Sequence, residues 1–450
     1  MSTMMSMPLH HLVSCRSTHV SCCLSSSSSS YFSGNSHTLS ASSSSVLRVH
    51  LLQLSGITRL TSTSTSFATD VNPWQRRRLL ETPCSTLNGC WRSGSMERWR
   101  RTSFMLKRSS SSSTEGNKEE DASISGGEGG LLGFYSDNQV VTLPQGHRFP
   151  MDKYRATRLL LEGDLQLRSI LTTQPAPLAS EEELCLVHDQ LYVQRIFMGM
   201  LDDQQQRAVG FPWSPALVDR SRASTGGTVA AMHAVMQGSR RMVAANIAGG
   251  THHAFAGHGE GFCVFNDIAV ASAVSLRDYP HLCNIQSPIL IIDLDVHQGN
   301  GTAKIFENDD RVITFSMHGA NNYPWRTKMK SNYDIDLPDN TGDEEYLTIL
   351  TEWLPHLIEL HEPSLIFFQA GVDALKEDSF GRLAMTRQGL LRRNNMVYSV
   401  CLENNLPLVI TMGGGYSRPM TASVEAHGDV YRSAALRYGA LRLRGNLSVH

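Results

Sequence analysis

The chain has 450 residues, a formal net charge of −2 and 41% hydrophobic residues, which suffices for one large globular domain with an additional segment. Because acidic and basic residues nearly balance, overall charge gives no basis for direct nucleic-acid binding. No run of about 18 apolar residues occurs, so we expect no membrane span. The nine cysteines lack CxxC spacing, which argues against a disulfide framework or a structural zinc finger.

Residues 1–114 differ in composition from the rest of the chain. Serine runs occupy 25–30 and 109–113, arginine is frequent, and the acidic residues are limited to Asp70, Glu81 and Glu97. This bias is typical of an organellar transit peptide and predicts a plastid or mitochondrial location. A solvated tail without a targeting role has a similar composition, and the three arginines at 76–78 leave the nucleus or cytoplasm as the alternative.

Glycine-rich and acidic residues 115–130 are interpreted as a linker, so the globular domain is expected over 131–450. Short apolar segments rich in Val, Ile and Phe alternate there with helical patterns. Because these strands are apolar on both faces, they predict an α/β fold with an open parallel sheet covered by helices on both sides. The expected strands lie within 242–250, 288–296, 311–317, 364–371 and 406–415, and the expected helices within 225–238, 343–363 and 386–405.

The segment "IIDLDVHQGNG" (291–301) places potential metal ligands where a buried strand ends. Side chains at alternate strand positions point the same way, so Asp295 and His297 could bind one cation, while Asp293 could hydrogen-bond one step behind them. A carboxylate and an imidazole suit zinc, which in catalytic sites has a third protein ligand. Asp373, after another expected strand, is the candidate for that third position.

Two further strand ends carry chemistry-bearing residues. His252 and His253 are adjacent in a glycine-rich turn and could act as base and acid if their partners differ. Tyr416 follows three glycines, Gly414 among them. Such a loop lets the backbone approach a ligand closely, and the phenol could donate to a developing oxyanion.

In this order, HH, GFCxxND, DLDxHxGNG, GxD and GGGY resemble the zinc-dependent histone deacetylase family over roughly 131–450. "GFPWSP" (210–215), "TGGT" (225–228) and "DLDVHQGNG" look most like its class IV branch, the histone deacetylase 11-like proteins, in a plant or bacterial-type form. The resemblance implies an open α/β fold shared with arginases, with about eight parallel strands. It also implies hydrolysis of the N6-acetyl-lysine amide in a protein or peptide substrate.

The resemblance also implies roles for individual residues. One zinc ion would be held by Asp295, His297 and Asp373. His252 and His253 would lie beside the catalytic water, with His253 as the base. Asp293 would hold His252, and Tyr416 would donate to the substrate carbonyl.

Further roles concern the substrate and a second cation. Gly261 and Phe262 would form a wall of the acyl-lysine tunnel, and Gly414 would contribute to substrate binding. An internal structural K⁺ site would involve Asp293, Asp295, His297, Ser316 and Met317. The aromatic residue that faces Phe262 in many relatives has no assignment from the sequence, so the acyl-chain preference stays open.

One residue departs from the pattern of many relatives. Asn300 stands where they carry an aspartate that holds the second histidine. An amide oxygen can still accept a hydrogen bond from His253, but it supplies no charge. We therefore expect His253 to be harder to protonate than in an aspartate-bearing relative, which favours its role as a base.

Three alternatives stay open at this point. A binuclear manganese hydrolase of the arginase type would need extra aspartates where this chain has Gly299 and Gly371. An acetylpolyamine or longer-chain acyl-lysine amidohydrolase could use the same catalytic residues. An inactive acyl-lysine-binding module is disfavoured because every residue needed for the chemistry is present.

Overall fold

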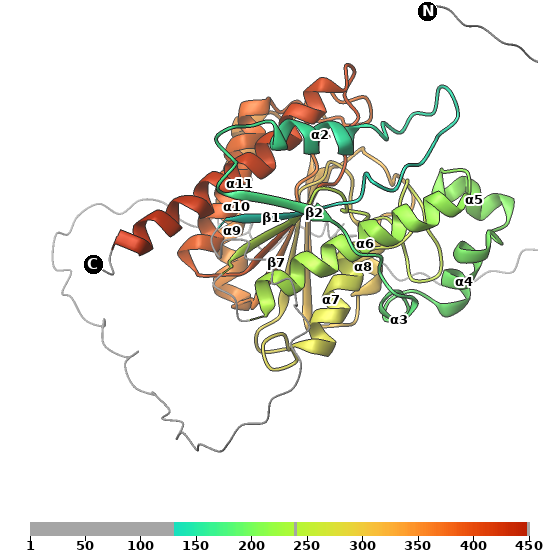
Figure 1. Ribbon diagram of the computed structural model, residues 1–450, viewed down its shortest axis with the longest axis horizontal. Coiled ribbons are helices and arrows are strands. Elements are labelled where there is room, and N and C mark those ends of the chain that lie inside the picture. The colour runs from blue at the N-terminus through green and yellow to red at the C-terminus, as the bar shows by residue number, and fades with distance from the viewer. Residues whose placement is uncertain (1–129, 238–240, 448–450) are drawn as a thin grey trace, which may run out of the picture. The chain divides into compact units, whose positions relative to one another are not determined.

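The computed structural model describes residues 130–237 and 241–447, and side chains up to residue 440 (Figure 1). The predicted segment 1–114 and nearly all of the predicted linker lie outside the described residues. Within the described residues no helix is both long enough and apolar enough to cross a membrane.

One parallel sheet organises the fold. Its eight strands follow the order β2-β1-β3-β8-β7-β4-β5-β6, which confirms the predicted open parallel sheet. Five strands coincide with the predicted segments: β3 (Val243–Asn246), β4 (Ile289–Asp293), β5 (Val312–Gly319), β7 (Leu365–Gln369) and β8 (Leu408–Thr411). The sequence did not predict β1 (Leu131–Tyr135), β2 (Leu171–Pro175) or β6 (Tyr333–Leu337), of which β2 and β6 are edge strands.

Helices cover both faces of the sheet (Figure 1). Along β4, Leu290 and Ile292 pack on one side, while Ile289 and Ile291 pack on the other, as the alternation of side chains in a strand requires. The first side is covered by α9 (Asp343–His361), α10 (Arg387–Glu403) and α11 (Thr421–Leu447), and the second by α6 (Pro215–Met236) and α7 (Asp267–Asp278). The remaining helices are α2 (Lys153–Glu162), α3 (Glu181–Leu184), α4 (Gln190–Met198), α5 (Asp203–Val209) and α8 (Asn300–Ile305).

The helix predicted over 225–238 begins ten residues earlier, at Pro215, after the N-cap Ser214. Gly226 and Gly227 therefore lie inside the helix rather than at its start. A Cβ at Gly226 would lie 2.1 Å from the carbonyl oxygen of Pro177, and one at Gly227 would lie 2.8 Å from Asn246. The two glycines are thus needed for close packing. Helix α9 matches its predicted range and runs through Pro355 without interruption.

All carboxyl ends of the strands lie along one edge of the sheet because the strands are parallel. Asp293 ends β4, Gln369 ends β7 and Thr411 ends β8, and these three strands are neighbours. The segments that follow them are those in which the sequence placed metal ligands and Tyr416. The topology therefore brings these segments together at one site.

Candidate active site

Asp295, His297 and Asp373 form a compact buried cluster beyond β4 and β7. One potential ligand atom from each lies within 4.8 Å of those of the others. His297 Nδ1 lies 2.9 Å from Asp295 Oδ1 and 3.1 Å from Asp373 Oδ2. The cluster therefore joins the three residues that the sequence nominated as metal ligands.

The chemistry of this cluster fits a divalent cation. Asp373 Oδ2 is buried and lies 3.1 Å from His297 Nδ1, but it accepts no hydrogen bond of regular geometry, so this carboxylate oxygen is available to a cation. Burial acts to lower the pKa of His297, but the neighbouring carboxylates of Asp295 and Asp373 outweigh it and raise this pKa to about 10. Two carboxylates and one imidazole are ligands that zinc accepts, with a position left for substrate.

Two glycines leave no room for additional acidic ligands. A Cβ at Gly371 would lie 2.4 Å from Asp295 Oδ2 and 2.9 Å from Asp295 Cα. A Cβ at Gly299 would lie 2.4 Å from Asp293 Oδ2. The two positions where a binuclear site would need aspartates are therefore in contact with the existing carboxylates, which favours a single metal ion.

His252 and His253 differ in their hydrogen-bond partners. His252 Nδ1 lies 2.7 Å from Asp293 Oδ2, and His253 Nδ1 lies 2.8 Å from Asn300 Oδ1. Burial acts to lower the pKa of His252, but the carboxylates of Asp293 and Asp295 outweigh it and raise that pKa. Burial lowers the pKa of His253 well below 6.5, and the charges of His252 and His297 act in the same direction. The pair thus combines one readily charged imidazole with one that stays neutral.

The turn that carries the histidines is held by a buried carboxylate. Asp267, at the start of α7, accepts hydrogen bonds from the backbone N–H groups of Gly250 (3.0 Å) and Thr251 (2.7 Å). Its Oδ2 also accepts from the hydroxyl of Thr228. Asp267 was not predicted as a site residue, although it is the aspartate of the GFCxxND motif.

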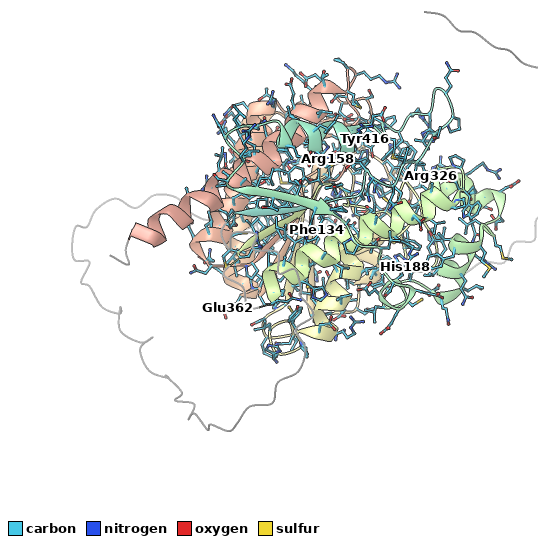
Figure 2. All side chains as sticks on the ribbon, in the orientation of Figure 1. Phe134, Arg158, His188, Arg326, Glu362 and Tyr416 are labelled. Atoms are coloured by element: carbon cyan, nitrogen blue, oxygen red, sulfur yellow. The ribbon has the colours of Figure 1, made fainter. Side chains whose placement is uncertain are left out.

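Tyr416 follows the carboxyl end of β8 along the chain, and its side chain is labelled in Figure 2. Its backbone N–H donates to Asp378 Oδ2 at 2.6 Å, and its ring centroid lies 6.4 Å from that of His297. Burial, followed by the charges of Asp295 and Asp373, raises the pKa of Tyr416 well above 10. The hydroxyl is therefore protonated at neutral pH and can donate a hydrogen bond.

Gly414 contributes through its backbone. Its N–H donates to Asp295 Oδ2 at 2.6 Å, and a Cβ there would lie 1.8 Å from Asp373 Oδ2. The hydrogen bond positions Asp295, a candidate metal ligand, and the short distance to Asp373 excludes any side chain at position 414. Gly414 also lines a small cavity together with His253, His297 and Tyr416, which places it beside the expected position of the substrate.

A cavity of about 630 Å³ is lined by His253 and His297 and also by Gly261, Phe262 and Tyr416. Gly261 has a φ of +58°, and a Cβ there would lie 2.7 Å from His253 Cδ2. Phe262 adopts a φ of +67°, which is uncommon for a residue with a side chain. The turn that carries the predicted tunnel wall thus packs directly against His253.

The lining of this cavity also contains Tyr323, which the sequence did not identify. Its ring lies 4.9 Å from that of His253, nearly perpendicular to it. Trp325 and the arginines Arg148 and Arg382 also line the cavity. Apart from its aromatic residues, the sequence around 317–325 contains no pattern that would have predicted Tyr323 as part of the cavity wall.

Residues of the predicted K⁺ site lie close together behind the cluster. Ser316 is the register partner of Asp293 across β4 and β5. Ser316 Oγ lies 2.9 Å from His318 Nδ1, and Asp293 Oδ1 accepts from the backbone N–H of Asp295 at 3.1 Å. Asp293, Asp295, His297, Ser316 and Met317 are all buried.

Comparison with known proteins gives the family. An uncharacterized protein of Picosynechococcus sp. is 40% identical over 300 residues, which cover 67% of this chain and 97% of that protein. Histone deacetylase 2 of Arabidopsis thaliana is 29% identical over 280 residues, covering 60% of this chain and 70% of the relative.

Solved structures share the fold. The crystal structure of a histone deacetylase homologue from Aquifex aeolicus superposes with a TM-score of 0.57 at 23% identity, covering 68% of this chain and 84% of that one. The crystal structure of the HDA15 HD domain gives the same TM-score at 21% identity, with 68% of this chain and 89% of that chain covered. The sequence model of the histone deacetylase domain matches residues 147–429, and the chain belongs to the histone deacetylase domain family.

Proposed function

We propose that this hydrolase removes the acetyl group from N6-acetyl-lysine in a protein or peptide, and that it depends on one zinc ion. The observation that carries this proposal is the position of the Asp295, His297 and Asp373 cluster. It lies beside the His252 and His253 pair, at the base of a cavity lined by Tyr416. A cation ligand set, a base and a hydrogen-bond donor are thus grouped as amide hydrolysis requires.

When bound, zinc would polarise the amide carbonyl and lower the pKa of a water molecule toward about 7. The rest of the chemistry falls to side chains of this protein. His253, which Asn300 holds through Nδ1, presents Nε2 as the acceptor for the proton of water and later returns a proton to the lysine amine. His252, paired with Asp293, contributes positive charge beside the developing negative charge.

Tyr416 would donate its hydroxyl hydrogen to the carbonyl oxygen as that oxygen gains charge. Two observations support this role. Tyr416 lines both the cavity of about 630 Å³ and the small cavity that Gly414 also lines, and its hydroxyl is protonated at neutral pH. One such donor contributes on the order of 3 kcal/mol to the transition state.

The positive charge around the cavity of about 630 Å³ favours an acyl-lysine peptide over an acetylpolyamine as the substrate. Arg148 and Arg382 line this cavity, and no carboxylate side chain belongs to its described lining. An acetylpolyamine keeps several positive charges and would be repelled there. A peptide can instead present neutral or acidic residues to the arginines.

Finer assignments belong to the same proposal. The motifs "GFPWSP", "TGGT" and "DLDVHQGNG" support a class IV, plant or bacterial-type member. The buried group around Ser316 supports a structural K⁺ ion. The serine- and arginine-rich composition of residues 1–114 supports import into a plastid or mitochondrion. We propose acetylated protein or peptide as the substrate, without direct nucleic-acid or membrane binding.

A substrate panel tests the activity. Purified protein is supplied with an acetyl-lysine peptide and, separately, with acetylspermidine, and its metal content is measured. The proposal predicts turnover of the peptide with kcat/KM at least about tenfold higher than for acetylspermidine. Preferential hydrolysis of acetylspermidine would make the enzyme a polyamine deacetylase and would contradict the assignment of its substrate.

A further inference from the structure

Two buried cations flank one tyrosine close to the reaction centre. The Nζ atom of Lys153 lies 5.4 Å from the ring centroid of Tyr154, and the Cζ atom of Arg220 lies 4.3 Å from the same centroid. Lys153 is 0% exposed and Arg220 is 6% exposed. Among the described residues neither cation forms an ion pair with a carboxylate. Buried charges are usually paired, so both cations call for an explanation.

Lys153 is explained by the backbone that it holds. Its ammonium group donates to the carbonyl oxygens of Gly413 (3.1 Å) and Gly415 (3.4 Å), in the loop that leads to Tyr416. Arg220 lacks such an anchor. Its described partner is the ring of Tyr154, whereas a guanidinium carries five N–H donors in a planar fork.

Arg220 lines a cavity of about 40 Å³ whose other walls include Phe149, Tyr154 and Phe262. A second cavity, of about 30 Å³, is lined by Phe149, Tyr154 and Phe262 as well, and also by His253, His297 and Tyr416. The two cavities share these aromatic walls and therefore adjoin. We call them together the acyl recess: His297 and Tyr416 line one part of it, and Arg220 lines the other.

The chemistry of the acyl recess is that of a site for a short apolar chain with an anionic end. Its walls near Arg220 are predominantly aromatic or aliphatic, and Arg220 is the charged side chain in that lining. Binding sites of this kind use apolar walls for affinity and a few polar groups for orientation. A guanidinium matches a carboxylate geometrically and binds it through two parallel hydrogen bonds.

We infer that the acyl recess takes an acyl group that ends in a carboxylate, of succinyl or glutaryl length, and that Arg220 binds that carboxylate. This inference rests on the proposed function, because it places the acyl carbonyl at the metal cluster. The reaction would break the amide C–N bond, join the oxygen of water to the acyl carbon, and release the lysine amine and a dicarboxylate.

The test uses matched acyl-lysine peptides on the full-length, zinc-loaded protein. Succinyl-lysine is compared with butyryl-lysine, which has the same chain length without the charge. The inference predicts a kcat/KM for the succinyl peptide about tenfold or more above that for the butyryl peptide. In Arg220→Met this ratio should fall by about tenfold or more, because the carboxylate would be buried without a partner. The matched control is Arg222→Met, on the same helix but outside the recess, which should leave the ratio within about twofold.

Calorimetric binding of free succinate and free acetate supplies a readout that does not depend on turnover. Wild-type protein should bind succinate more tightly than acetate, and Arg220→Met should lose most of that difference. Equal binding of the two anions, or a wild-type preference for the butyryl peptide, would overturn the inference whether or not the Arg220 variant folds. Hydrolysis of acetyl-lysine with either result would leave the proposed function intact, whereas failure to hydrolyse every acyl-lysine peptide would refute the proposed function itself.

Discussion

Asn300 Nδ2 donates a hydrogen bond to Glu260 Oε1 over 2.7 Å. This contact fixes the orientation of the amide, because its oxygen must then face His253 Nδ1, 2.8 Å away. An aspartate at position 300 would instead place two carboxylates against each other. The departure from many relatives at this position is therefore matched by Glu260, a residue that the sequence analysis did not connect with the site.

The first prediction follows from that relationship. Asn300→Asp should lower kcat by about tenfold to a hundredfold, the range found when groups that orient site residues are lost, because Glu260 loses its donor and repels the new carboxylate. Adding Glu260→Gln should restore much of the loss, since the glutamine amide can donate to the carboxylate introduced at position 300. A double-mutant cycle on kcat measures this coupling. Additive effects of the two substitutions would show that Glu260 does not set the orientation of the side chain at position 300.

The second prediction concerns the metal. Asp373→Ala should abolish activity and lower the zinc content, because it removes one of the three proposed ligands. Elemental analysis of the purified variant checks this. Asp309→Ala, which alters an aspartate paired with Arg311 at the surface, is the matched control and should retain the metal. Full zinc content in Asp373→Ala would remove Asp373 from the ligand set.

The third prediction separates the hydroxyl of Tyr416 from its ring. Tyr416→Phe should lower kcat by about two to three orders of magnitude with little change in KM, because the hydrogen bond strengthens in the transition state. The contacts of the ring with Phe262 and Phe380 persist, so the melting temperature and zinc content should not change. A kcat within about threefold of wild type would leave Tyr416 with a packing role alone.

The fourth prediction tests the steric reason for a single metal ion. Gly371→Ala should reduce zinc binding, because its Cβ would lie 2.4 Å from Asp295 Oδ2. The matched control is Gly342→Ala, where the nearest atom would be 3.9 Å from the added Cβ. That control changes an N-cap residue and should cost at most about 1 kcal/mol. Equal zinc affinity in the two variants would contradict the crowding argument.

The fifth prediction concerns residues 1–114. A fusion of this segment to a fluorescent protein should enter plastids or mitochondria when expressed in plant cells, because the segment is rich in serine and arginine and poor in acids. Confocal imaging with organelle markers measures the distribution. A diffuse or purely nuclear signal would refute the transit-peptide interpretation.

The sequence predicted those parts of the site that follow strands. Asp295, His297, Asp373 and Tyr416 lie just beyond strands that are apolar on both faces, and parallel strands bring such positions to one edge. Strands β2 and β6 escaped prediction because they lie at the edges of the sheet, where few of their residues are buried and the apolar pattern is weak.

Residues that act through long-range contacts could not be predicted in this way. Tyr323 reaches His253 from a segment 70 positions later in the chain, and Lys153 contacts the carbonyl of Gly413 from a helix 260 positions earlier. Neither lies in a local pattern that indicates a pocket. Arg220 likewise occupies a helix whose apolar periodicity gives no sign of a neighbouring cavity.

Titration of the metal-free protein with zinc tests the central claim most directly. Turnover of an acetyl-lysine peptide is measured at each step, together with the zinc bound per chain. Activity should rise in proportion to bound zinc and reach its maximum at about one ion per chain, held by Asp295, His297 and Asp373. Full activity without metal, or a maximum that requires two manganese ions per chain, would contradict it.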